Sequence, residues 1–171
     1  GRAGSPDRSS AVAAEIAGFV GTAQPSQFGA GGYSGPAEWS FRRMILHYAT
    51  LCAAAGGVDA FLVGSELRGL STLRREGNVF PFVAALRQLA AEVKAILPGA
   101  QISYGADWTE YAGHQPQDGT GDVFFHLDPF WSAPEVGFIG IDNYMPLADW
   151  REGDQHADRL AGWGSIYDTA Y

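Results

Sequence analysis

The apolar residues of this chain follow two alternating patterns. In several stretches they recur every three or four residues, the spacing that places side chains on one face of an amphipathic helix. These stretches predict helices over about 12–20, from 34–36 to 56–57, and over about 80–97. The tail over about 154–171 is also predicted to be helical, although Gly162 and Gly164 interrupt its pattern.

Short, continuously apolar runs lie between the predicted helices. The three stronger runs cover residues 58–63, 101–105 and 136–141, and a weaker run covers 122–125. Runs of this length and character are typical of strands that are buried on both faces of a parallel sheet. Helices and strands alternate, so the sequence predicts an α/β fold built from right-handed βαβ units, with a glycine-rich loop over 24–35.

A carboxylate follows each of the three stronger runs. Glu66 follows the first, Asp107 the second and Asp142 the third. Parallel strands end at the same edge of a sheet, which is where α/β barrels and open α/β sheets build their active sites. Asp and Asn also follow strands as turn formers and helix caps, so a binding site and ordinary turn chemistry both remain open.

Aromatic and further polar residues lie near these strand ends in the sequence. Carbohydrate chemistry uses such a mixture, because carboxyl groups move protons or accept from sugar hydroxyls while flat rings cover the C–H faces of the sugar. An aromatic-rich core is the alternative interpretation. The candidate substrate-binding residues are Asp107, Trp108, Glu110, His126, Asp142, Asn143, Tyr144 and Trp150.

Composition excludes several classes of function. The chain carries 11 Lys and Arg against 19 Asp and Glu, and residues 101–171 hold 2 basic and 12 acidic side chains, so we expect no nucleic-acid partner. The single Cys52 excludes a disulfide framework. No apolar run approaches the roughly 20 residues of a membrane span, so we expect no membrane partner. No phosphate-loop, nucleophile-elbow or zinc-helix motif occurs, so we expect no cofactor and no metal.

Five segments are recognisable as the motifs of a known family. They are residues 39–49, 57–70, 106–111, 125–129 and 140–150. Together they resemble the glycoside-hydrolase TIM-barrel-like domain of the large tail protein in alphaproteobacterial gene transfer agents and related phages, which is often labelled a host-specificity protein. The resemblance extends over roughly residues 30–170.

This resemblance implies a (β/α)₈ barrel similar to that of retaining glycosidases. In those enzymes the acid/base Glu follows the fourth strand, and Glu66 within Gly64-Ser65-Glu66 resembles that catalytic residue. The segment Gly140–Tyr144 resembles the end of the sixth strand, and the nucleophilic Glu follows the seventh strand, for which no matching segment occurs. A whole barrel takes at least about 200 residues. We therefore expect residues 1–171 to form a partial barrel, about strands 4 to 6 with flanking helices, that is inactive alone.

The resemblance also implies a setting and partners. We expect a tail-tip or baseplate domain of a phage-like particle, produced in the bacterial cytoplasm, that acts on or binds bacterial cell-surface polysaccharide or peptidoglycan. Other tail proteins are expected partners, and exposed strand edges predict self-association. A non-catalytic structural or sugar-binding module is the alternative, and a free-standing polysaccharide hydrolase is a third reading.

Overall fold

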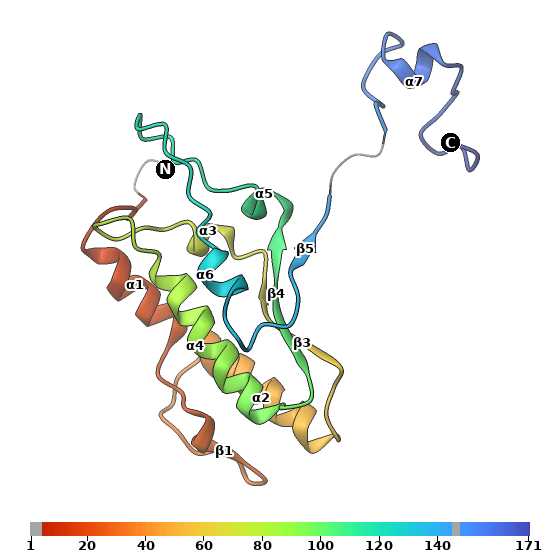
Figure 1. The fold of residues 1–171 in the computed structure, drawn as a ribbon. Coiled ribbons are helices and arrows are strands. Elements are labelled where there is room, and N and C mark those ends of the chain that lie inside the picture. Colours follow the sequence, from red (N-terminus) through yellow and green to blue (C-terminus); the bar gives the residue numbers. More distant parts are fainter. Residues whose placement is uncertain (1–4, 145–147) are drawn as a thin grey trace.

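The computed structural model describes residues 5–144 and 148–171 (Figure 1). Its helices are α1 (Ala11–Val20), α2 (Phe41–Ala54), α3 (Arg68–Ser71), α4 (Pro81–Ile96), α5 (Trp108–Tyr111), α6 (Asp128–Trp131) and α7 (Ala157–Leu160), with a 3₁₀ turn η1 (Pro25–Gln27). Its strands are β1 (Phe28–Gly29), β2 (Gly32–Tyr33), β3 (Ala60–Ser65), β4 (Gln101–Asp107) and β5 (Gly140–Asp142). The predicted α/β class is confirmed, and the part of the chain described here contains no closed barrel.

Three parallel strands form the central sheet, in the order β3-β4-β5. At its upper end Asp107 on β4 pairs with Asp142 on β5. A bulge between Leu62 and Ser65 shifts the register of β3, so that Ser65 pairs with Gly105. The sheet is therefore aligned so that β3, β4 and β5 all finish at one edge.

A layer of helices covers one face of this sheet, with α4 packed against β3 and β4 (Figure 1). Its amphipathic pattern explains the packing, because Leu86, Leu89 and Val93 lie on one stripe of α4 and are buried. They join the alternate residues of β4, Ile102 and Tyr104, in a single core. The helix predicted over 80–97 is confirmed.

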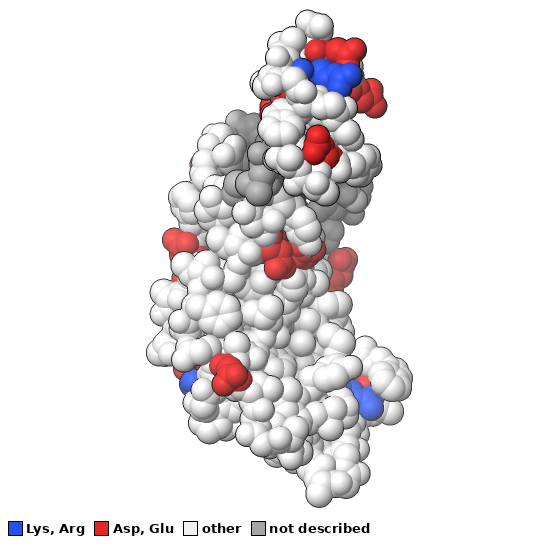
Figure 2. All heavy atoms as spheres, turned by 90° about the vertical axis from the view of Figure 1, so that its right-hand side faces the viewer, with Lys and Arg blue, Asp and Glu red and all other residues white. Residues whose placement is uncertain are grey.

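Among the described residues, no helix covers the opposite face of the sheet (Figure 1). Leu62, which pairs with Ser103, is 43% exposed, whereas its neighbour Val63 on the helical side is fully buried. The prediction that every strand is buried on both faces is therefore wrong for β3 and β5, where Leu62 and Ile141 remain exposed, whereas β4 is buried from Ile102 through Ala106. Figure 2 views the molecule from this side and shows a largely uncharged surface below the C-terminal segment.

The second predicted helix begins later than its predicted start at residues 34–36. α2 starts at Phe41, because Ser40 caps it by accepting a hydrogen bond from the Arg43 backbone at 3.2 Å. The residues before it form a loop that contains the small hairpin of β1 and β2. The loop predicted over 24–35 thus holds two short strands.

Three other predicted elements differ from the structure. Within 136–141 only Gly140 and Ile141 belong to a strand, β5, and Val136 forms an isolated parallel bridge to Ile102. Between them the hydroxyl of Ser103 donates to the carbonyl of Phe138 at 2.6 Å. Within 122–125 only Phe124 pairs, in an antiparallel bridge to His114 outside the sheet. The tail forms the four-residue α7, followed by Gly162 at a φ of 97° that a continuing helix does not allow.

Candidate functional site

The three predicted carboxylates, Glu66, Asp107 and Asp142, come from the same end of three adjacent parallel strands, and we call this region the carboxylate edge. The hydroxyl of Ser65 donates to Asp142 Oδ2 at 2.7 Å and joins the ends of β3 and β5 across β4. Gly105 lies between them, and a Cβ there would lie 3.0 Å from Asp142 Oδ2. A glycine on the central strand therefore leaves room for the side chains of both neighbours.

Glu66 leaves β3 in an unusual backbone conformation. Its φ is 53°, in the left-handed region that non-glycine residues rarely adopt, while its amide donates to the carbonyl of Gly105 at 2.7 Å. The next amide, that of Leu67, donates to the hydroxyl of Tyr104 at 2.6 Å. These two hydrogen bonds hold the turn and leave the Glu66 side chain exposed. Strained backbone of this kind occurs frequently at functional sites.

Asp107 ends β4 and begins α5. Its carboxylate accepts hydrogen bonds from the side chain and the backbone of Thr109, the latter at 2.8 Å. These bonds, aided by the nearby charge of Arg68, lower the pKa of Asp107, so the group stays ionised at neutral pH. Trp108 follows as the first residue of α5 and is half-buried. Turn chemistry thus accounts for one oxygen of Asp107.

Tyr144 supplies the aromatic ring of the carboxylate edge. Its side chain is 67% exposed and is hydrogen-bonded to Glu66, and the negative charge of Glu66 raises the pKa of the Tyr144 phenol. Asn143, between Asp142 and Tyr144, is also exposed. The edge therefore presents carboxylate acceptors beside an open aromatic ring, which is an arrangement that can bind polyhydroxylated ligands.

Two candidate residues are buried and do not lie on the surface of this edge. Glu110 is 2% exposed, and its carboxylate accepts from Ser71, from Tyr104 at 3.2 Å and from the backbone amide of Asp107 at 2.8 Å. Burial raises the pKa of Glu110. His126 is 3% exposed, and burial lowers its pKa to about 4. The helix cap of α5 directs Glu110 inward, so neither residue can contact a ligand without a rearrangement.

A family model described as the GTA TIM-barrel-like domain matches residues 39–171. The chain belongs to this family. The match confirms the GTA TIM-barrel-like domain indicated by the sequence motifs, and it begins at residue 39, where the first motif begins, rather than near residue 30 as expected. A search of curated proteins found no match.

Trp150 lies in a different part of this GTA TIM-barrel-like domain from the other candidates. Its ring packs 4.7 Å from that of His156 and 5.8 Å from that of Tyr171, in the C-terminal segment that contains α7. Figure 1 shows this segment lying apart from the sheet. The structure does not bring Trp150 to the carboxylate edge. Its ring packs instead against aromatic rings of its own segment.

Sequence reasoning missed three residues that shape the edge of the GTA TIM-barrel-like domain. Ser65 joins two strand ends, Tyr104 holds the Leu67 amide, and Arg68 lies close enough to influence Asp107. Ser65 could have been found from its position just after the predicted strand over 58–63, since the ends of parallel strands meet at one edge of a sheet. Nothing in the local sequence identifies Tyr104, which is buried in the middle of a strand.

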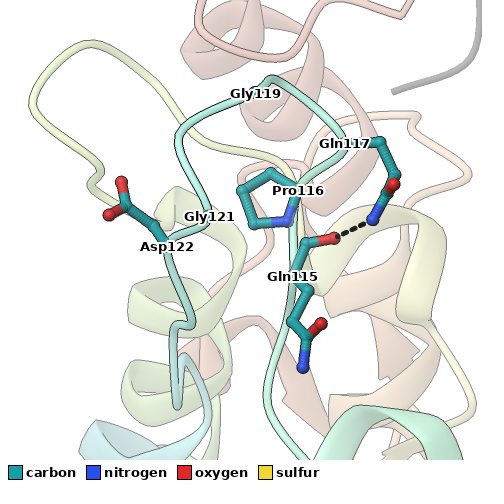
Figure 3. Close-up of a pocket in the computed structure, with 6 residues that line it drawn as sticks. All are labelled: Gln115, Pro116, Gln117, Gly119, Gly121 and Asp122. Carbon is teal, nitrogen blue, oxygen red and sulfur yellow. Dashed lines mark hydrogen bonds between the residues drawn. The ribbon is translucent and has the colours of Figure 1, made fainter.

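The remaining hollows and clusters of the described residues do not extend this site. A polar hollow of about 330 Å³ lies in the loop over 115–122, where Gln117 donates to the carbonyl of Gln115 (Figure 3). Among residues 5–144 and 148–171 no group of three His, Cys, Asp or Glu side chains is arranged to hold a metal ion. No helix within these ranges is long and apolar enough to cross a membrane.

Proposed function

We propose that this GTA TIM-barrel-like domain binds bacterial cell-surface polysaccharide or peptidoglycan at its carboxylate edge, as part of the tail tip or baseplate of a phage-like particle. One observation carries the proposal. Glu66, Asp107 and Asp142 meet at the C-terminal end of three parallel strands, with the exposed ring of Tyr144 hydrogen-bonded to Glu66. Active sites of α/β barrels are built at this end of the sheet.

The chemistry assigns a different role to each group. The carboxylates of Asp107 and Asp142 accept hydrogen bonds from sugar hydroxyls, and Tyr144 offers its ring to the C–H face of a sugar. Glu66 is the group that would donate a proton to a leaving glycosidic oxygen. A retaining mechanism also needs a nucleophilic carboxylate about 5–5.5 Å from the acid, and the resemblance assigns that residue to a later strand. We therefore expect residues 1–171 to bind glycan without hydrolysing it.

A non-catalytic sugar-binding module is the second candidate, and the surroundings of Glu66 favour it. A general acid is normally held in an apolar pocket that keeps it protonated. The side chain of Glu66 is instead exposed and hydrogen-bonded to Tyr144. The two candidate functions therefore differ in the role of Glu66: it is needed for the chemical step of hydrolysis, but binding alone does not require it as an acid.

Tyr144→Ala is expected to weaken binding of soluble peptidoglycan fragments by about fivefold, because stacking on one ring contributes about 1 kcal/mol. Glu66→Gln should leave binding nearly unchanged, since it keeps the shape of the side chain. Calorimetric titration measures both effects. Tyr167→Ala is the matched control, because Tyr167 is 91% exposed in the C-terminal segment.

Two results would count against this proposed function. Equal binding by the wild-type chain and Tyr144→Ala would remove the carboxylate edge as the site. Release of reducing ends by residues 1–171 alone would show that the chain contains a complete catalytic pair, contrary to the expected inactivity.

Self-association is a further expected property of the chain. In the described ranges the outer edges of β3 and β5 have no strand partner, and the uncovered sheet face exposes Leu62. Unpaired edges and apolar faces favour association. Sedimentation should show an oligomer at high protein concentration that Leu62→Lys weakens and Leu160→Lys, a change at an even more exposed leucine of α7, does not. A wild-type chain that stays monomeric throughout would refute the expectation.

A further inference from the structure

An aromatic groove lies outside the carboxylate edge. It has a volume of about 730 Å³ and lies between the end of α1, strand β2 and the first half of α2. Tyr33, Trp39, Arg43, His47 and Tyr48 are the lining residues that matter here. Trp39 is 95% exposed and Tyr48 is 56% exposed. A concentration of large exposed rings in one hollow is uncommon on a protein surface and marks a binding site.

The loop that carries Trp39 is fixed by hydrogen bonds on both sides of the tryptophan. The carboxylate of Glu38 accepts from the amides of Thr22 at 3.0 Å and Ala23 at 2.9 Å, and from the hydroxyl of Ser40 at 2.7 Å. These bonds, that from Ser40 first, lower the pKa of Glu38 to about 2. The indole of Trp39 is therefore exposed on a well-anchored loop rather than on a loose one.

The same loop depends on a glycine at the end of α1. Gly21 has a φ of 81°, and a Cβ at this position would lie 2.2 Å from that of Ser40. Only glycine permits the chain to pass so close to the residue that caps α2. Gly21 and Ser40 thus help to hold Trp39 in a position where its indole is exposed.

Arg43 places a positive charge in the floor of the groove. Its guanidinium lies 4.4 Å from the ring centres of both Tyr33 and Trp39, and it donates one hydrogen bond to the backbone carbonyl of Glu38. Within residues 5–144 and 148–171, Arg43 makes no ion pair with a carboxylate. Among the residues that the structure describes, no Asp or Glu lines the groove. The groove is therefore cationic on a chain whose net charge is −8.

We propose that the aromatic groove binds an acidic sugar unit of a surface glycan, with the sugar ring stacked on Trp39 and its carboxylate paired with Arg43. The choice of a glycan rests on the function proposed above, and the choice of an acidic one rests on the groove itself. An aromatic platform beside a fixed guanidinium complements a ring that has a C–H face and an anionic group. The volume also lies in the roughly 300–1,000 Å³ range of small-ligand sites.

The test compares tetragalacturonate with neutral maltotetraose in calorimetric titrations of the full chain. Tetragalacturonate should bind the wild-type chain at least tenfold more tightly than maltotetraose, and the difference should shrink at high salt. Trp39→Ala should weaken tetragalacturonate binding at least tenfold, and Arg43→Gln should remove the preference for the acid. Arg43→Lys should restore part of it. Arg87→Gln is the control, because Arg87 is an exposed arginine on α4.

Several results would overturn the proposed groove, and one further variant separates it from the carboxylate edge. Equal affinity for both sugars, or binding that survives Trp39→Ala, overturns the proposal. An indole of Trp39 that is shielded from acrylamide quenching in the free protein would mean that another protein segment occupies the groove. Tyr144→Ala in the same titrations separates the two sites: loss with Tyr144→Ala alone supports the carboxylate edge and refutes the groove, while loss with Trp39→Ala alone does the reverse.

Discussion

Arg74→Ala is expected to lower the free energy of unfolding by about 3–5 kcal/mol, the usual effect of removing one partner from a buried ion pair. Arg74 is 1% exposed and binds two carboxylates from distant parts of the chain. One of its guanidinium nitrogens lies 2.6 Å from Asp7 Oδ2 and 3.0 Å from Asp118 Oδ2. Alanine would leave the mostly buried Asp7 without a counter-charge and Asp118 with only its longer contact to Arg8 at 3.6 Å, and it would open a cavity beside Phe124.

The carboxylates of this ion cluster are adapted to the presence of Arg74. Burial alone would raise the pKa of Asp7, but the hydrogen bonds and charge of Arg74 outweigh it and lower that pKa. Thr120 and Arg74 together lower the pKa of Asp118. Groups with a lowered pKa stabilise the fold at neutral pH and lose that contribution as the pH falls through their folded pKa. Because Asp7 belongs to the N-terminal segment and Asp118 to the 112–125 loop, their ion pairs with Arg74 connect both segments to the rest of the fold.

Urea denaturation at pH 7 measures the effect. Arg74→Lys keeps the charge but loses the forked geometry, so it should destabilise the chain less than Arg74→Ala does. Arg75→Ala is the matched control, because Arg75 is the neighbouring arginine and its side chain is exposed. This substitution should change the free energy of unfolding by no more than about 0.5 kcal/mol. A stability of Arg74→Ala within about 1 kcal/mol of the wild type would contradict the expected role of the cluster.

The parts of the fold that depend on periodicity were predictable from the sequence. The apolar stripe of α4 and the buried run of β4 each have a regular spacing, and both elements lie close to their predicted bounds. The relation of Glu66, Asp107 and Asp142 followed from one further rule, that parallel strands end at one edge. These inferences need only local pattern and strand direction.

The parts that depend on individual contacts between distant residues were not predictable. In the sequence Asp7 lies shortly before α1 and is a residue type that often begins helices. In the structure its carboxylate instead binds Arg74, 67 positions away in the chain. Glu110 resembles a second acid near Asp107, yet the cap geometry of α5 turns it into the core. The spacing of residues along the chain does not specify which way a short helix directs its side chains. Such assignments therefore require the structure.

A buried histidine should make stability depend on pH in the acid range. His126 is 3% exposed and lies between Phe80, whose ring centre is 5.4 Å away, and Ser71, whose hydroxyl is 3.3 Å from Nε2. Burial lowers the pKa of His126 from 6.5 to about 4, and the neighbouring His114 adds to this effect. The folded chain therefore holds His126 in its neutral form well below pH 6.5.

The direction of the effect follows from that lowered pKa. The unfolded chain takes up a proton at His126 near pH 6.5 and the folded chain only near pH 4, so stability is lost as the pH falls between these values. The pKa difference corresponds to about 3 kcal/mol. Glu110 acts in the opposite sense, because its raised pKa lowers stability as the pH rises through it. The wild-type profile thus combines two opposed contributions.

His126→Gln isolates the histidine contribution, since glutamine keeps hydrogen-bonding groups but does not titrate. Whatever its stability at pH 7, the variant should lose about 3 kcal/mol less than the wild type between pH 6.5 and pH 4 in urea titrations. His47→Gln is the control at an exposed histidine of α2 and should follow the wild-type profile. Parallel profiles for the wild type and His126→Gln would show that the folded chain accepts the charge on His126. In that case the pocket formed with Phe80 and Ser71 would have to open to water above pH 4.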